Sequence, residues 1–165
     1  MTAAKWRNAL GTATTILLIG LPMIVVGRPT YDEDIDPFTG ENNSRVVLSA
    51  EGAYFDEKVS IVWQCSADDL VVSLEHVRLS GDDDEVIVRT KIGDAAASEP
   101  RRYPLASSHH ATQIDAADGR ALTKGAVSAD EVMIRIIDPG AEETLTSTFV
   151  TTNLRSVLAR LACFP

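Results

Sequence analysis

Residues 61–77 read IVWQCSADDLVVSLEHV, and this stretch decides the fold class. Apolar residues alternate with polar ones, and a period of two is typical of half-buried β-strands. We therefore predict one strand over residues 59–65 and a second over residues 70–77, whose apolar side chains share one face.

The same period recurs along the chain as far as Thr151. The other predicted strands cover residues 45–49, 85–91, 102–105, 112–114, 131–137 and 144–151. The turn sequence LSGDDDE at 79–85 predicts a hairpin between the strands 70–77 and 85–91. Prolines and glycines interrupt residues 93–125, which we expect to be loops with edge strands. The fold class is therefore all-β, an antiparallel sandwich or open barrel of about six to eight strands.

The period changes at the end of the chain. Four apolar residues have the i, i+3, i+4, i+7 spacing of an amphipathic helix: Leu154, Val157, Leu158 and Leu161. We predict one C-terminal α-helix here, capped by Thr152 or Asn153.

The first 28 residues indicate export. Lys5 and Arg7 precede a charge-free span that runs from Asn8 to Gly27. Residues 1–28 are predicted as a helical signal peptide or membrane anchor, and residues 9–27 would cross the inner membrane if they are not cleaved. The positive-inside bias keeps the basic start in the cytoplasm. The rest of the chain is expected to be periplasmic or otherwise extracytoplasmic.

An acidic, Pro- and Gly-containing stretch follows, so residues 29–44 are predicted as a linker and residues 45–165 as the exported β domain. Within the linker, Asp32, Asp34 and Asp36 have the spacing of the first three ligand positions of a calcium loop. Pro37 stands where that loop requires glycine, which favours a solvated linker.

The chain has two cysteines, Cys65 and Cys163. An exported compartment is oxidising, so we predict that they form a disulfide that closes the domain. Two buried free thiols and a redox pair are the alternatives. The sequence has no C-x-x-C, which disfavours the redox pair.

The net charge of −9 disfavours a nucleic-acid partner, because an acidic surface repels phosphates. It equally disfavours docking on anionic lipid through a basic patch. The sequence contains no phosphate-binding glycine loop, no H-E-x-x-H and no zinc-ligand spacing, and we expect no cofactor.

Few other residues could take part in catalysis or metal binding. Asp82, Asp83 and Asp84 are weak calcium candidates on the 79–85 turn, where an exposed hairpin tip is the simpler interpretation. His109 and His110 are adjacent but lack the ligand spacing of a zinc site. His76 is expected to be half-buried and hydrogen-bonded, and no catalytic residue is assigned.

The order of the motifs resembles that of the exported VasI-like proteins associated with type VI secretion. The stretches that carry the resemblance lie between residues 45 and 163: IVWQC, LVVSLEHV, EVIVRT, EVMIRIIDPG and TSTFVTTNLRSVLARLAC. The aromatic residue that the family places after its arginine strand would be Tyr103, and residues 106–126 have no counterpart. The resemblance implies a periplasmic accessory protein without catalytic residues.

The first hypothesis is therefore a non-enzymatic, exported or membrane-tethered domain that binds another envelope or secretion-apparatus protein. Its binding surface would be an exposed strand edge or the loops of 93–125. The alternatives are a hydrolase of an envelope polymer that uses His109 or His110 with a carboxylate, and a calcium-stabilised module that uses the acids of 82–85 or 32–36.

Overall fold

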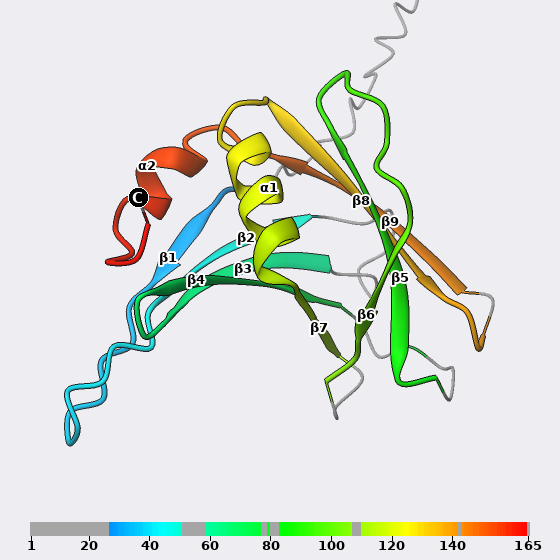
Figure 1. Cartoon of the computed structure of the whole chain (residues 1–165). Coiled ribbons are helices and arrows are strands. Elements are labelled where there is room, and N and C mark those ends of the chain that lie inside the picture. The colour runs from blue at the N-terminus through cyan, green and yellow to red at the C-terminus, as the bar shows by residue number, and fades with distance from the viewer. Residues whose placement is uncertain are drawn as a thin grey trace, which may run out of the picture.

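The computed structural model describes residues 27–50, 59–76, 79, 83–106, 110–141 and 143–164. They form a mostly β domain with two antiparallel sheets, as Figure 1 shows. The first sheet has the order β1-β2-β3-β4-β7, with β1 (Thr30–Asp32), β2 (Arg45–Ala50), β3 (Val59–Ser66), β4 (Asp69–Glu75) and β7 (Ala111–Ile114). The second has the order β6-β5-β8-β9, with β6 (Arg101–Pro104), β5 (Glu85–Ile92), β8 (Glu131–Asp138) and β9 (Glu143–Val150).

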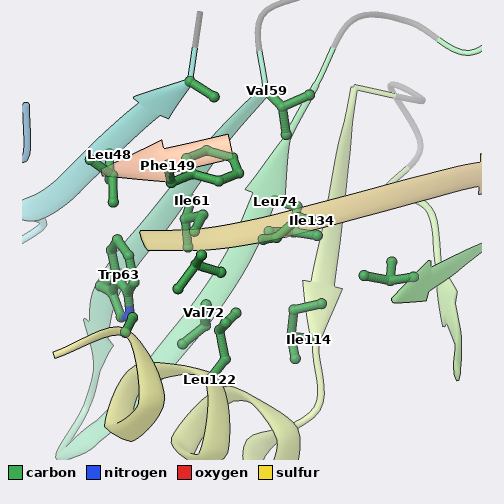
Figure 2. Close-up of a cluster of buried hydrophobic side chains, with 14 of the residues drawn as sticks. Leu48, Val59, Ile61, Trp63, Val72, Leu74, Ile114, Leu122, Ile134 and Phe149 are labelled. Atoms are coloured by element: carbon green, nitrogen blue, oxygen red, sulfur yellow. The ribbon is translucent and has the colours of Figure 1, made fainter. Parts of the chain in front are cut away.

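The two sheets share one core. Alternate residues of β2, β4, β5 and β8 point inward, because each of these strands has one buried and one more exposed face. In β3 the same alternation holds, but Val62 on its other face is buried as well. Figure 2 shows Trp63 and Ile61 of β3 beside Leu48 of β2 and Phe149 of β9. The alternation that predicted the strands is therefore confirmed as the pattern that builds the core.

The number and pairing of the strands differ from the prediction. The described residues contain nine strands, because β1 adds to the predicted set. The expected hairpin between 70–77 and 85–91 is wrong: β4 pairs with β3 and β7, and β5 pairs with β6 and β8. β4 belongs to the first sheet and β5, the next strand along the chain, to the second.

A second helix lies in the region predicted as loops. This helix, α1 (Ala116–Ala126), begins after Asp115, whose side chain accepts hydrogen bonds from the backbone N–H groups of Ala117 and Asp118. Trp63 fixes α1 against the first sheet, since its indole N–H donates to the Thr123 hydroxyl at 2.9 Å. That hydroxyl in turn donates to the carbonyl of Gly119 at 2.7 Å.

Glycines inside α1 mark where the helix touches the sheets. A Cβ on Gly125 would lie 2.2 Å from Cδ1 of Ile92 in β5. Replacing Gly125 by Ala is expected to destabilise the protein by about 1–2 kcal/mol, because overpacking outweighs the gain in helix propensity. Urea unfolding measures the loss.

The same experiment has an internal check. Combining Gly125→Ala with Ile92→Val, which removes Cδ1, should recover most of the loss, and Lys124→Ala on the exposed side of α1 should change little. A Gly125→Ala protein as stable as the parent would contradict this packing.

The C-terminal helix is confirmed but short. It is α2 (Leu154–Leu158), and Leu154, Leu158 and Leu161 are buried as expected. Asn153 occupies the N-cap position in a left-handed conformation (φ 64°) and its side chain makes no capping hydrogen bond, so the predicted side-chain cap is wrong. The guanidinium of Arg160 stacks 3.7 Å from the ring centroid of Tyr31, which joins this end of the chain to β1.

The predicted disulfide is confirmed. Cys65 at the end of β3 pairs with Cys163, 98 residues later, and their Cα atoms are 5.7 Å apart. The backbone N–H of Cys163 also donates to Sγ of Cys65 at 3.2 Å. The disulfide therefore ties the segment after α2 to the first sheet.

The segment predicted as a linker is part of the domain. Within residues 29–44, β1 pairs with β2, and Ile35 forms a bridge with Asn42. The domain boundary at residue 45 is thus too late. Nearly all of the predicted signal or anchor segment, residues 1–26, lies outside the described residues, as does its predicted helix. Among the helices that are described, none has the length and apolar character needed to cross a membrane.

Candidate functional site

The connection between β1 and β2, residues 33–44, projects from the end of the first sheet (Figure 1) and is called here the tip hairpin. Its turn is built by Asp36, whose Oδ1 accepts hydrogen bonds from the backbone N–H groups of Phe38 at 2.7 Å and Thr39 at 3.1 Å. Gly40 closes the turn with its N–H on the carbonyl of Asp36 at 2.8 Å and adopts the positive φ of 74° that glycine tolerates.

Backbone bonds continue below the turn and fix the tip hairpin. The N–H of Asp36 donates to the carbonyl of Glu41 at 2.9 Å, and that of Asn43 to the carbonyl of Asp34 at 2.7 Å. The hydroxyl of Ser44, which is buried, accepts from the N–H of Asp34 at 3.0 Å. The tip hairpin is therefore an ordered element, although its Pro and Gly residues resemble those of a linker.

Two large apolar side chains stand out on this element. Phe38 is 95% exposed and Ile35 is 52% exposed, and they are the exposed large hydrophobic residues of the part of the chain that is described. Acidic residues flank them in the sequence: Glu33, Asp34, Asp36 and Glu41. Single exposed apolar residues are common on proteins, but two on one ordered, projecting hairpin form a candidate contact surface.

The stability of the turn that carries this surface depends on the ionisation of Asp36. Hydrogen bonds from the backbone N–H of Phe38, and then of Thr39, hold the pKa of the Asp36 carboxyl below its ordinary value. The carboxylate is therefore ionised at neutral pH. The stabilisation of the turn is present above the pKa of the unfolded chain and is lost as the pH falls through the lower folded pKa.

A groove of about 620 Å³ lies next to the base of the tip hairpin. Its walls come from the return arm Glu41–Ser44, from the end of β3 with the following turn, and from the C-terminal segment at Leu161 and Ala162. Cys65 is part of the lining, so the disulfide holds two walls of this groove together.

A second, smaller cleft of about 370 Å³ lies between α1 and strands β5 and β6. Here the buried Tyr103 donates its hydroxyl hydrogen to Asp118, which also pairs with Arg101 at 3.2 Å. Burial, and then the hydrogen bond to the Asp118 carboxylate, raises the pKa of the Tyr103 phenol far above its ordinary value. The phenol is thus neutral at physiological pH, and its hydrogen bond to Asp118 attaches β6 to α1.

The described histidines differ in their exposure to solvent. His109 lies outside the described residues, and His110 is exposed just before β7. His76 is buried, deeper than the half-buried position predicted, and its backbone N–H donates to the carbonyl of His110 at 2.8 Å. This contact aligns β4 with β7 through main-chain atoms.

Two of the predicted calcium ligands make other contacts. Asp32 pairs with Arg45 at 3.2 Å, and the Asp36 carboxylate accepts the turn hydrogen bonds. Asp83 and Asp84 are exposed, and Asp82 lies outside the described residues. Within the described ranges, no three His, Cys, Asp or Glu side chains gather closely enough to hold a metal ion.

The tip hairpin was not predicted as a functional element. The edge strands predicted within residues 93–125 are confirmed as β6 and β7, whereas α1 occupies a stretch predicted as loop. The binding role of this range stays a prediction. A signal was nevertheless present in the sequence: DPFTG places an aromatic residue between turn formers.

Comparison with known proteins gives no match to this chain, whether with protein-family models, with curated proteins or with solved structures.

Proposed function

We propose that this protein is a non-enzymatic, exported or membrane-tethered β domain that binds another envelope protein through the tip hairpin. A role as a secretion-system accessory fits the resemblance of its motifs to VasI-like proteins. The observation that carries the proposal is the exposure of Phe38 and Ile35 on one projecting, ordered hairpin.

The order of the tip hairpin favours binding. Aromatic residues are frequent among the side chains that dominate binding energy, and they act best when they are held in place before the partner arrives. The Asp36 turn and the bonds to Glu41, Asn43 and Ser44 provide that fixation. A partner would then bind Phe38 without an ordering cost in the backbone of this hairpin.

The orientation of the chain also favours this surface. The described chain begins at Gly27, shortly before β1, and the tip hairpin follows at the other end of β1 (Figure 1). If residues 9–27 cross the inner membrane, the hairpin points away from the place where the chain leaves it. The Cys65–Cys163 disulfide supports placing the domain in an oxidising compartment outside the cytosol.

Photo-cross-linking in cells tests the proposal. A photoreactive phenylalanine analogue in place of Phe38, in the full chain, should give a covalent adduct with one envelope protein. The same analogue in place of Arg120, which is exposed on α1, should not give that adduct. Equal adducts at both positions, or none at position 38, would contradict the proposal.

The partner found in this way permits a measurement of affinity. Phe38→Ala should weaken binding by about 30-fold or more, which corresponds to a hot-spot residue of about 2 kcal/mol. Arg120→Ala should leave the dissociation constant unchanged. Because Phe38 is 95% exposed, its loss should not change the unfolding midpoint, and an unaltered affinity would refute its role.

A further inference from the structure

The edges of the two sheets are not alike. The first sheet ends in β1 and β7, of 3 and 4 residues, and the second ends in β6 and β9, of 4 and 8 residues. The two short strands β6 and β7 also meet each other through the bridge between Leu105 and Thr112. Short edge strands are one means by which proteins prevent pairing with other chains, whereas β9 is a long edge strand.

The sequence of β9 is also free of the usual protective residues. It reads ETLTSTFV, with no proline, glycine, lysine or arginine, and its one charge is at Glu143. Threonine, phenylalanine and valine favour extended strands. Among the described strands, β8 is the one that pairs with β9, so the opposite edge of β9 has no neighbouring strand there.

Part of this edge is more open than the rest. Val150, at the end of β9, lines a pocket together with Gly27, Arg28 and Pro29, so the beginning of the described chain lies next to it. In Figure 1 the Glu143 end of β9 extends away from β1 and β2. With respect to the described residues, the edge without a neighbouring strand therefore covers mainly residues 143–148.

We propose that a second copy of this chain pairs with β9 in an antiparallel manner, across a two-fold axis at Thr146. The pairing joins the four-stranded sheets of the two copies into one continuous sheet. Closed two-fold dimers are the commonest assemblies of identical subunits, and their interfaces must be self-complementary.

The burial pattern restricts the register to pairings in which like faces of the strand lie opposite each other. Thr144, Thr146 and Thr148 are exposed, whereas Ser147 and Phe149 are buried. With the axis at Thr146, Thr146 faces its own copy and Thr144 faces Thr148, so the exposed threonines meet each other, whereas Glu143 would lie opposite the buried Phe149. Threonine pairs of this kind stabilise neighbouring strands. A shift by one residue would place exposed threonines opposite buried side chains.

The single charge of β9 does not oppose the pairing, because the two copies of Glu143 would lie at opposite ends of the paired strands. Arg135 of β8 donates from Nε to the Thr146 hydroxyl at 3.2 Å and lines a shallow surface pocket with Arg89 and Lys91. This locally basic face is an electrostatic cost of the pairing, because it brings the two copies of Arg135 near the axis. The tip hairpin lies well apart from the Glu143 end of β9 in Figure 1, so pairing leaves it exposed.

Cysteine cross-linking of the full chain in membranes tests the dimer. Thr146→Cys should form an intermolecular disulfide under mild oxidation, visible as a dimer on a non-reducing gel, because the two side chains face each other across the axis. Glu143→Cys is the matched control and should not link to itself, because the two positions would be about 20 Å apart. A Thr146→Cys protein that stays monomeric, or that links to a different protein, would overturn the proposal.

Sedimentation of the full chain in detergent gives the second readout. The parent protein should show a monomer–dimer equilibrium, and Thr146→Lys should shift it to monomer by placing like charges opposite each other. Thr152→Lys, at an exposed threonine outside β9, should leave the equilibrium unchanged. A parent that is monomeric at its highest soluble concentration, or a Thr146→Lys protein that dimerises equally well, would overturn the β9 pairing.

Discussion

Loss of the Cys65–Cys163 disulfide is expected to lower the free energy of unfolding by about 4–5 kcal/mol. The bond closes a loop across a sequence separation of 98 residues, so it removes much conformational freedom from the unfolded chain. A domain of this size is commonly stable by about 5–15 kcal/mol, so the loss is a large fraction of the total. Urea unfolding of the Cys65→Ala, Cys163→Ala double variant measures it.

Two controls separate the cross-link from local packing. Reducing agent should shift the unfolding midpoint of the parent protein but not that of the double variant. Ser156→Ala, on the exposed side of α2, should leave the parent midpoint nearly unchanged. A parent protein with the same midpoint in oxidising and reducing buffer would show that the disulfide does not stabilise the fold.

Truncation of Trp63 has the second large effect. Trp63 is fully buried between β2, β4 and α1, and Trp63→Ala is expected to cost about 3–5 kcal/mol through the cavity that it leaves. The same change removes the indole N–H that donates to Thr123, and with it one of the contacts that hold α1 against the first sheet. Thermal or urea unfolding followed by circular dichroism records the loss.

Trp63→Phe is the matched variant. It keeps most of the buried apolar surface and loses the hydrogen bond to Thr123, so the expected cost is smaller, about 1–3 kcal/mol. Hydrogen exchange should then increase more in α1 than in β3, because the lost bond joins these two elements. Equal costs for the Ala and Phe variants would contradict the role assigned to the ring in the core.

The strands could be predicted because alternation is a local pattern. The disulfide could be predicted because two cysteines can pair within one chain in a single way. Alternation along β3, β4 and β8 reports directly on one buried face. With two cysteines in the chain, export leaves a single possible pairing within it. The amphipathic spacing of the C-terminal leucines likewise placed α2.

The missed elements depend on contacts between distant residues. Gly119 and Gly125 indicated loops, yet they lie inside α1 where it packs closely on Val72 and Ile92. The pairing of the strands also depends on distant residues, because β4 and β5 are neighbours in sequence but belong to different sheets. Neither fact can be derived from the spacing of residues along one segment.

The candidate site was missed for a related reason. Asp36, Pro37 and Gly40 are equally typical of a linker and of a tight hairpin turn. The hydrogen bond from Asp34 to the buried Ser44 hydroxyl and the bridge between Ile35 and Asn42 decide for the hairpin, and both join its two arms. Once the hairpin is ordered, Phe38 at its tip becomes the residue to test.

The proposal that this domain works outside the cytosol is tested most directly by the state of its thiols in cells. Cells are lysed in denaturant with an alkylating reagent, and the intact protein is weighed by mass spectrometry with and without prior reduction. We expect no alkylation of Cys65 and Cys163 before reduction and alkylation of both after it, because the two thiols are joined in the disulfide. Alkylation of both cysteines without reduction would contradict it.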